Sequence, residues 1–248
     1  MMKILAHRGA SGYAPENTLE AFALAARLGA DGVELDVHVS ADGELIVIHD
    51  ETVDRTCNGS GLIQNMTLSE IKALNARNGK GGLEKCVRIP TLREVYELLK
   101  PTPLIINVEI KTDAIVYPGI LEKLIALEEE LDMGERIIYS SFNHNTIREL
   151  KALHPAAKTG LLYVEALAEP WDYALRNGAD AIHPDKFSTL NYPDIMDECN
   201  KRGIETNIWT VNEAEDIAFL IRHNATSVIT NFPALALLIR EEIEKENG

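Results

Sequence analysis

The sequence predicts an α/β fold, a single (β/α)8 barrel of the TIM type. Short β-branched runs alternate with longer helical patterns along the whole chain, which is typical of repeated βα units around a parallel sheet. Eight such units can be counted in the sequence, and eight strands are the number that closes this barrel. The length of 248 residues also matches one barrel domain of roughly 250 residues.

Eight apolar runs are expected to form the barrel strands. Each is apolar enough to be buried on both faces, as the strands of a parallel sheet are. In chain order they cover residues 3–8, 32–37, 104–111, 137–142, 159–163, 180–184, 204–211 and 227–231. A helical pattern follows each run, so we expect helices to surround the sheet.

The first helix has clear start and end signals. Asn17 is expected to be its N-cap, with Glu20 at the capping-box position three residues later. Leu28 and Gly29 mark its end, because glycine is the common residue just beyond a helix. The last helix is expected to run from Pro233 toward Glu246.

One segment interrupts the alternation after the second strand. Residues 40–43 form a turn sequence, and a second apolar run follows it, so a hairpin is expected. If the turn centres on Asp42, the returning strand brings His49 back to the level of Glu34 and Asp36. The hairpin therefore predicts that a histidine joins two acidic side chains at the rim of the barrel.

Residues 45–90 are expected to be an insertion that caps the barrel mouth. The stretch 51–90 is rich in Gly, Asn and Thr and holds only one short helical pattern, near 68–74. The helix expected after the second strand then resumes at 91–99. The whole chain, 1–248, is therefore expected to be one domain with one insertion.

The charge balance restricts the partners of the chain. It carries 24 Lys and Arg against 39 Asp and Glu, a formal net charge of −15. No basic stripe is present to displace the counterions of a polyanion, so nucleic acid and anionic membrane surfaces are not expected as partners. A small anionic substrate would need local positive charge from Arg, Lys or a metal ion.

The sequence predicts a cytoplasmic protein without stable membrane association. The first apolar residues give way to polar ones at His7, too early for the apolar region of a signal peptide. Apolar runs such as 234–239 are far shorter than the ~18 residues of a membrane span. The three cysteines are odd in number and have no metal-ligand spacing, so a disulfide framework is not expected; they are Cys57, Cys86 and Cys199. The oligomeric state is left open.

Three carboxylates are expected at the C-terminal ends of the strands, where the active site of such a barrel lies. Glu34 and Asp36 are two residues apart on one strand, so their side chains share a face, and Glu109 lies on the next barrel strand. These acids repel one another unless a cation lies between them. Oxygen ligands without thiols suit one divalent ion, Mg²⁺ or Ca²⁺. The alternative is that each acid caps a helix or pairs with Arg8 or Lys111.

Two histidines are expected at the same mouth, His7 at the end of the first strand and His49 at the end of the hairpin. A single histidine at a strand end is more often a structural hydrogen-bonding group. Two that converge on one metal site favour catalysis, because imidazole can accept one proton and donate another near neutral pH. His183, at another strand end, either supports the site or belongs to a packed turn.

Arg8 and Lys111 supply the local positive charge that an anionic substrate requires. Arginine matches phosphate oxygens with a fork of donors, and lysine adds a point charge. The alternative is an ion pair with the acidic side chains, and both interpretations can hold together. Trp209 is a candidate for the floor of a pocket for an apolar or alcohol group, or else a core residue.

With these residues assembled, the chain resembles the glycerophosphodiester phosphodiesterase family over essentially its whole length. The matching segments are His7-Arg8-Gly9 with Pro15-Glu16-Asn17-Thr18, Glu34-Leu35-Asp36-Val37, Asp42-Gly43, His49-Asp50, Asp54-Arg55-Thr56 with Asn58-Gly59-Ser60-Gly61, Glu109-Ile110-Lys111, Ser140-Ser141-Phe142, and Trp209-Thr210-Val211-Asn212. Two positions depart from the usual pattern. Cys57 stands where Thr is common, and Asn231 stands where the last strand often ends in Asp; neither is assigned chemistry.

The resemblance implies metal-dependent hydrolysis of small glycerophosphodiesters, such as glycerophosphocholine, to glycerol 3-phosphate and an alcohol. It implies a divalent ion held by Glu34, Asp36 and Glu109, with His7 and His49 as acid and base. Which histidine is the acid, and whether water or the 2-hydroxyl of the substrate attacks first, is left open.

Three other functions remain as alternatives. One is a catalytically silent barrel that binds a phosphodiester, although the complete set of acids and histidines argues against it. Another is a phospholipase D-like phosphodiesterase that acts on lysolipids. The third is an aldolase-like barrel with Lys111 as a Schiff-base nucleophile, which the neighbouring carboxylates oppose because they prevent the depressed pKa that this chemistry needs.

Overall fold

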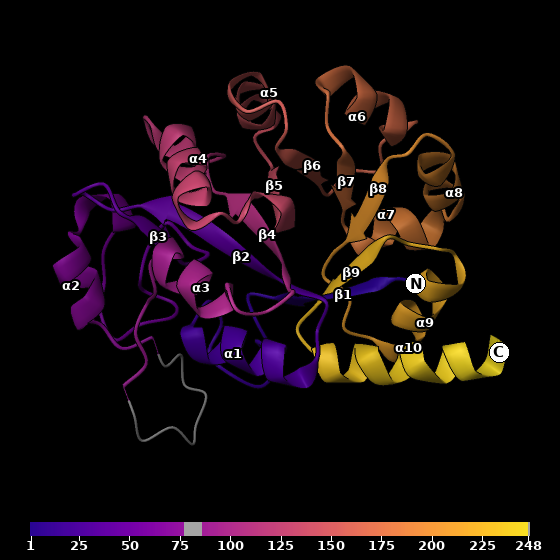
Figure 1. The fold of residues 1–248 in the computed structure, drawn as a ribbon, viewed down its shortest axis with the longest axis horizontal. Helices are drawn as coiled ribbons and strands as arrows, with labels where there is room; N and C mark the ends of the chain where they lie inside the picture. Colours follow the sequence, from indigo (N-terminus) through magenta and orange to yellow (C-terminus); the bar gives the residue numbers. More distant parts are fainter. Residues whose placement is uncertain (77–85, 248) are drawn as a thin grey trace.

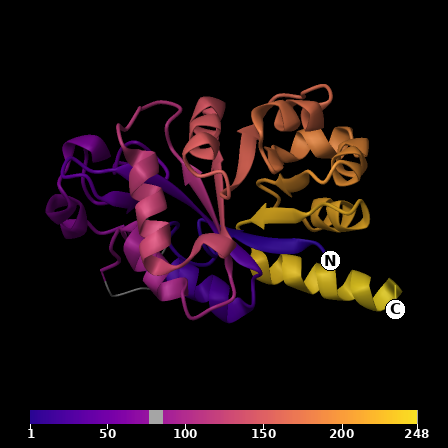
Figure 2. The ribbon, with the colours of Figure 1, turned by 45° about the horizontal axis from the view of Figure 1, so that its top comes forward.

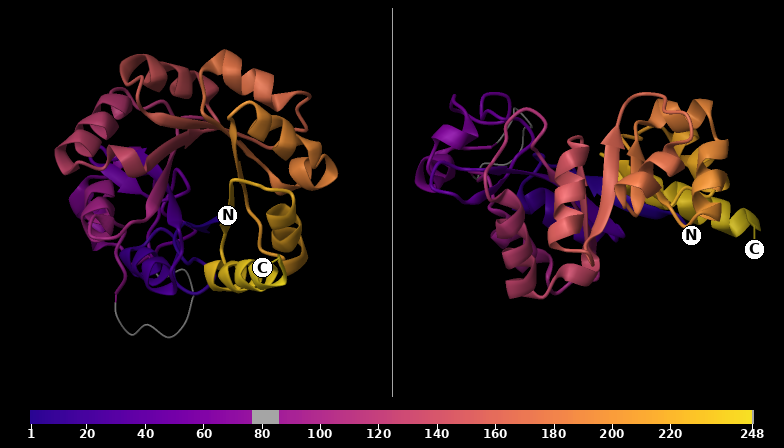
Figure 3. Two further views of the ribbon diagram at one scale, coloured as in Figure 1. Left: turned by 45° about the vertical axis from the view of Figure 1, so that its right-hand side comes forward. Right: turned by 90° about the horizontal axis from the view of Figure 1, so that it is seen from above.

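The chain folds into a closed parallel barrel with helices outside it (Figure 1). The computed structural model describes residues 1–76 and 86–247. Within them, eight parallel strands run around the barrel in the order β1-β9-β8-β7-β6-β5-β4-β2, and the pairing of β1 with β2 closes the ring. A view toward the open end shows the helices surrounding this ring (Figure 3). The predicted fold class is therefore confirmed.

The strands lie where the apolar runs predicted them. The barrel strands are β1 (Lys3–His7), β2 (Gly32–Val39), β4 (Ile105–Ile110), β5 (Ile137–Ser141), β6 (Lys158–Tyr163), β7 (Ala181–Pro184), β8 (Glu205–Ile208) and β9 (Ser227–Thr230). The largest difference is at β8, which ends three residues before the expected position 211. Trp209 therefore lies just beyond the end of a strand and not within it.

The helices follow the strands in alternation. They are α1 (Leu19–Leu28), α2 (Leu68–Ala73), α3 (Leu92–Leu99), α4 (Ile120–Leu131), α5 (His144–Leu153), α6 (Pro170–Asn177), α7 (Lys186–Asn191), α8 (Asp194–Lys201), α9 (Ala214–Arg222) and α10 (Pro233–Asn247), with short 3-10 turns at η1 (Ile63–Asn65) and η2 (Gly134–Arg136). In Figure 2, α10 runs along the base of the barrel beside the first strand. None of the helices in the described residues is both long and apolar enough to span a bilayer.

The start of α1 differs from the sequence expectation. Thr18 is the N-cap, and its hydroxyl accepts a hydrogen bond from the backbone N–H of Ala21. The prediction of Asn17 as N-cap was therefore wrong, and Glu20 does not occupy the capping-box position. Asn17 instead has a positive φ of 54° and donates its amide to Asp36. The predicted end is confirmed, with Gly29 in a left-handed conformation after Leu28.

The hairpin after β2 has the register that the turn sequence predicted. β3 (Leu45–Val47) pairs antiparallel with β2, with Val37 opposite Val47 and Val39 opposite Leu45. This register centres on Asp42, whose carboxylate accepts a hydrogen bond from the Ser40 hydroxyl at 2.6 Å. The end of the hairpin is fixed further because His38 Nε2 contacts the carbonyl of His49 at 3.0 Å.

The expected insertion, 45–90, packs around a small apolar cluster of its own. Part of it, 77–85, lies outside the described residues. The cluster comprises Ile46, Ile48, Val53, Ile63, Ile71, Ala76, Val87 and Ile89. Leu45 and Val47 of the same segment belong to the main core, so the segment is anchored to the barrel as well as packed around its own cluster. Its capping role stays a prediction.

Alternation along β2 divides the barrel into a charged inside and an apolar outside. Leu35 lies between Glu34 and Asp36 and belongs to the core between the sheet and the helices, where it is fully buried. Phe22 of α1 and Tyr96 of α3 belong to the same core. Burial of Leu35 therefore holds β2 in the orientation that turns both acids inward.

We expect Leu35→Ala to lower the free energy of unfolding by about 2–5 kcal/mol, because it removes a buried side chain and leaves a cavity. Urea denaturation of the purified protein measures this change. Leu175→Ala is the matched control, since Leu175 is 51% exposed and its loss should change stability by less than about 0.5 kcal/mol. Equal stability of the two variants would contradict the packing role of Leu35.

Candidate active site

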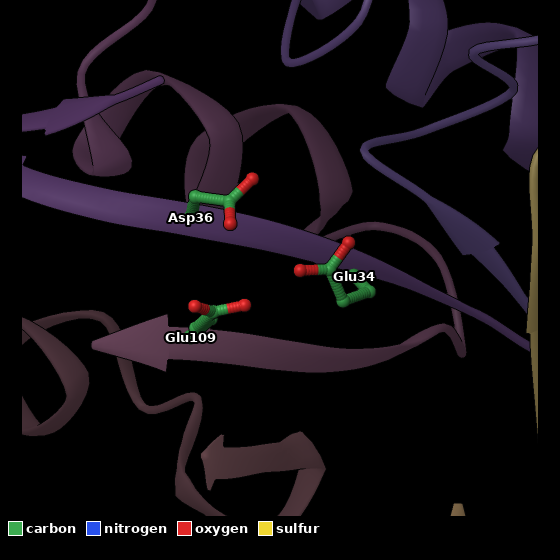
Figure 4. Close-up of side chains that lie close together, drawn as sticks. All are labelled: Glu34, Asp36 and Glu109. Carbon is green, nitrogen blue, oxygen red and sulfur yellow. The ribbon is translucent and has the colours of Figure 1, made fainter. Parts of the chain in front are cut away.

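Three carboxylates converge at the C-terminal ends of two neighbouring strands. Glu34 and Asp36 come from β2 and Glu109 from β4, and the strand register sets Asp36 beside Glu109. Each offers an oxygen that lies within 4.8 Å of those of the other two. Figure 4 shows the three side chains turned toward a common space. The sequence thus predicted correctly that these acids lie together, while their role as ligands stays a prediction.

Burial makes this cluster costly without a cation. Burial and the charge of Asp36 raise the pKa of Glu109 to about 7, although Lys111 acts in the opposite direction. Burial, Asp36 and Glu109 raise the pKa of Glu34 well above its ordinary value. Burial also raises the pKa of Asp36, but Arg8 and other nearby positive groups outweigh it and hold that pKa well below the usual range. A divalent ion between these oxygens would relieve the repulsion that raises the pKa values of Glu34 and Glu109.

The donor set fits one hard divalent cation. All three side chains offer carboxylate oxygens, which Mg²⁺ and Ca²⁺ prefer over softer ligands. Asp36 Oδ1 and the neighbouring Asn17 Oδ1 are buried acceptors without a hydrogen-bond partner in the described part of the chain. Unpaired buried oxygens are costly in an apolar interior, and coordination of a cation would satisfy them.

His7 lies beside the carboxylates because its strand pairs with β2, which places it opposite Glu34. Its Nδ1 is 2.6 Å from Asn231 Oδ1, an oxygen that also accepts from the Ser11 hydroxyl. An amide oxygen can only accept, so His7 Nδ1 donates to it, and Nε2 of the neutral ring remains unprotonated. Burial, followed by the charge of Arg8, lowers the pKa of His7 to about 4, so the ring is neutral near neutral pH.

His49 follows the hairpin and is more open to solvent, with 32% of its side chain exposed against 15% for His7. Its Nδ1 is 2.6 Å from Asp50 Oδ1, and a carboxylate oxygen accepts the Nδ1 proton. Nε2 of His49 is then the nitrogen left for chemistry. The two rings thus share one pattern, with Nδ1 anchored by an oxygen and Nε2 available.

Arg8 and Lys111 are both present and both paired, so the two interpretations of the sequence hold together. Arg8 Nε is 3.5 Å from Asp36 Oδ2, and its Nη1 donates to Glu16 at 2.9 Å. Lys111 Nζ donates to Glu109 Oε1 at 2.7 Å. Both cations therefore lie beside the three carboxylates, while their role toward a substrate stays a prediction.

Trp209 lies at the site and not deep in the core. It lines a cavity of about 20 Å³ together with His7, Glu34 and Glu109. Its indole N–H donates to the carbonyl of His183 at 2.7 Å. His183 itself is fully buried inside the barrel and bonded to Asn207, and it does not line this cavity. Its environment favours the structural interpretation.

Four side chains near the site were not singled out from the sequence: Asn231, Asp50, Glu16 and Arg55. Asn231 was noted only as a departure from a family pattern, yet it fixes the proton of His7. Asp50 and Arg55 belong to matched segments but were given no role. Only Asp50 offered a sequence signal, because it directly follows His49; Asn231, Glu16 and Arg55 reach their partners through contacts between distant loops.

Comparisons with known proteins give one consistent match. The model of the "Glycerophosphoryl diester phosphodiesterase family" matches residues 7–235. A glycerophosphodiester phosphodiesterase of Caldanaerobacter subterraneus subsp. tengcongensis is 46% identical over 239 residues, which cover 96% of this chain and 98% of that protein.

Solved structures agree with this match. The crystal structure of a glycerophosphodiester phosphodiesterase from Agrobacterium tumefaciens superposes with a TM-score of 0.84 at 31% identity, covering 96% of this chain and 100% of that one. A phosphodiesterase from Oleispira antarctica, in complex with the product sn-glycerol-3-phosphate, has a TM-score of 0.83 at 28% identity, covering 96% of each chain.

We expect Glu34→Gln to stabilise the metal-free protein by about 1–3 kcal/mol near pH 8, because it removes one of three repelling buried charges. The raised pKa of Glu109 has a defined consequence for the wild type. A carboxyl whose pKa rises on folding from 4.5 to about 7 stabilises the protein below pH 4.5, and this contribution is lost as the pH rises through 7.

Urea denaturation in EDTA near pH 5 and near pH 8 measures both effects. The stability of the wild type should fall between these values more steeply than that of Glu34→Gln, and Mg²⁺ or Ca²⁺ should restore it. Glu20→Gln, at an exposed position on α1, is the control and should behave as the wild type. A Glu34→Gln protein no more stable than the wild type near pH 8 would refute the repulsion.

Proposed function

Because the chain belongs to the glycerophosphoryl diester phosphodiesterase family, we propose that its barrel mouth hydrolyses glycerophosphodiesters to glycerol 3-phosphate and an alcohol. The observation that carries this conclusion is the convergence of Glu34, Asp36 and Glu109 at the C-terminal ends of β2 and β4. The chain acts as one domain, with 45–90 over part of the mouth. The expectations of a cytoplasmic location and of no nucleic-acid or membrane partner stay predictions.

The three acids would hold one divalent cation, Mg²⁺ or Ca²⁺. When bound, such an ion supplies positive charge at a non-bridging phosphate oxygen and so lowers the cost of the charge that develops there. The oxygen-only donor set and the raised pKa values of Glu34 and Glu109 support this role. Arg8 and Lys111 lie beside the same carboxylates, where they would bind the remaining phosphate oxygens.

We assign His7 the role of general base. Its ring is neutral near neutral pH, and Asn231 holds the proton on Nδ1, so Nε2 presents a lone pair next to the acids. His7 Nε2 takes the proton of the attacking hydroxyl, either water or the 2-hydroxyl of the substrate, as its oxygen forms a bond to phosphorus.

His49 then acts as the general acid. The Asp50 carboxylate at Nδ1 stabilises positive charge on this ring, and the greater exposure of His49 suits the side from which an alcohol leaves. As the bond between phosphorus and the leaving oxygen breaks, His49 Nε2 gives its proton to that oxygen, so no free alkoxide forms. Trp209, which lines the adjoining cavity, would contact the carbon atoms of the substrate.

The aldolase-like alternative loses support from the surroundings of Lys111. Burial lowers the pKa of this lysine, but Glu109 and Asp36 outweigh burial and raise it above the ordinary value. A Schiff-base nucleophile needs an unprotonated amine, whereas this amine stays protonated. Action on lysolipids, or silent binding of a phosphodiester, is decided by the assay below.

We expect the purified protein to release glycerol 3-phosphate from glycerophosphodiesters in an enzyme-coupled assay. EDTA should abolish the release, and Mg²⁺ or Ca²⁺ should restore it, because the acids cannot bind phosphate without a cation between them. Glycerophosphocholine, glycerophosphoethanolamine and a lysophospholipid are compared in parallel. Turnover that is indifferent to EDTA would remove the ion from the mechanism, and binding without turnover would favour the silent barrel.

We expect His7→Ala and His49→Ala each to lower kcat by about 10²-fold or more, the usual scale of general acid-base catalysis. The same coupled assay measures both variants at saturating substrate and cation. His223→Ala is the matched control, because its ring stacks on Phe219 of α9 and bonds to that residue's carbonyl. Near-normal rates in both test variants would refute the assignment.

A further inference from the structure

Arg55, in the segment 45–90, connects the loop after β1 to the end of the β2–β3 hairpin. Its Nη1 and Nη2 donate to the two carboxylate oxygens of Glu16 at 2.9 and 2.8 Å. Its Nε and Nη2 donate to the two oxygens of Asp50 at 2.6 and 2.9 Å. One planar guanidinium thus holds two carboxylates, each with two hydrogen bonds, which fixes their orientation as well as their distance.

Asp50 transmits this geometry to His49. Hydrogen bonds from Arg55, acting against burial, lower the pKa of Asp50 to about 2, so the group is a carboxylate at neutral pH. A carboxylate can only accept, so its oxygen 2.6 Å from His49 Nδ1 holds the proton on that nitrogen. The backbone at His49 is fixed separately by His38. Ring orientation and tautomer of His49 therefore depend on where Asp50 is held.

Glu16 provides the fixed end of this chain of contacts. Its Oε1 also accepts from Arg8 Nη1 at 2.9 Å, and Arg8 in turn lies beside Asp36. Without Arg55, Glu16 would still keep its ion pair with Arg8. Asp50 would lose its link to Glu16 and to the loop after β1, because Arg55 makes that link among the described ion pairs. The loss of Arg55 should thus affect His49 far more than Arg8.

The ion pairs of Arg55 are expected to contribute little to the free energy of folding, so they are better explained by a role in the site. The Arg55 side chain is 43% exposed, and exposed ion pairs contribute little to the free energy of folding. Asp50 takes the place of the carboxylate that orients the histidine in other acid-base sites, and Arg55 in turn holds that carboxylate.

We propose that Arg55 is a positioning residue that, through Asp50, sets the ring orientation and the Nδ1–H tautomer of His49. This inference rests on the proposed function: with Nδ1–H held by Asp50, Nε2 is the nitrogen that takes up a proton to form the imidazolium and then gives that proton to the leaving oxygen. His49, Asp50 and Arg55 all lie in the segment 45–90, so this segment would supply both the general acid and the groups that orient it.

The kinetic test compares Arg55→Gln, Arg55→Lys and Asp50→Asn in the full chain. We expect Arg55→Gln to lower kcat by about 10- to 100-fold, the scale on which orienting partners of a functional histidine act, and to change KM by less than about threefold. Arg55→Lys should recover part of the loss, because lysine keeps the positive charge but cannot form two bidentate hydrogen-bond pairs at once.

The double variant Arg55→Gln/Asp50→Asn tests whether Arg55 and Asp50 act together on His49 or affect kcat independently. If both residues act through His49, its kcat should be no lower than that of the more impaired single variant. Multiplied losses in the double variant would overturn the proposal. So would a loss in Arg55→Gln that appears only in KM.

The spectroscopic test observes His49 directly. In ¹⁵N-histidine-labelled protein above the titration range of imidazole, the shifts of the two ring nitrogens distinguish the tautomers, and His49→Ala assigns the signals. The wild type should show a protonated Nδ1 and an unprotonated Nε2 at His49, whereas Arg55→Gln should show a mixture. An unchanged tautomer together with kcat within about twofold of the wild type would overturn the proposal.

Arg93→Gln is the matched control. Arg93 forms an equally bidentate pair with Glu130 between α3 and α4, and none of its described hydrogen bonds involves a histidine. It should leave both kcat and the His49 signals unchanged. If the wild type released no glycerol 3-phosphate, the proposed function would fail, while the tautomer measurement would still decide the role of Arg55. If Arg55→Gln failed to fold, Asp50→Asn and Arg55→Lys would carry the same comparison.

Discussion

Electrostatic repulsion among three buried acids is the constraint on which the rest of the site depends. Glu34, Asp36 and Glu109 cannot all be charged in one dry space unless positive charge is close by. Arg8 and Lys111 supply part of that charge from the same strand ends. Although the chain has a net charge of −15, Arg8 and Lys111 place positive charge at the mouth where the proposed anionic substrate would bind. The proposed binding of a cation by the acids and of a phosphate by Arg8 and Lys111 would both follow from this one local arrangement of charge.

The pairing and alternation of the barrel strands position the three acids and His7 without any irregular backbone in β2. Alternation along β2 turns Glu34 and Asp36 inward while Leu35 packs against the helices, so each residue of the strand serves either the core or the site. Parallel pairing then sets His7 opposite Glu34 and Asp36 opposite Glu109. The convergence follows from strand register and does not require a flexible loop to close.

The fold and the charged cluster could be predicted because both follow from local pattern. Apolar runs marked the strands, a turn centred on Asp42 gave the hairpin register, and a two-residue spacing put the acids on one face. Side-chain contacts between distant loops have no such pattern. Asn17 is of a residue type that often caps helices, but its side chain donates to Asp36. Asn231 contacts His7 although the two residues lie near opposite ends of the sequence. Such contacts depend on backbone conformation, here a positive φ at Asn17, that composition does not reveal.

The separate apolar cluster of the segment 45–90 has a consequence for how such enzymes diversify. Because Ile46, Ile63 and Ile71 belong to a cluster distinct from the main barrel core, mutations among them should disturb that core less than mutations within it. Selection could therefore reshape the entrance, and with it the accepted head groups, while the barrel stays constant. His49, Asp50 and Arg55 would be the exceptions, because their contacts with one another and with Glu16 have to be preserved while the rest of the segment diverges.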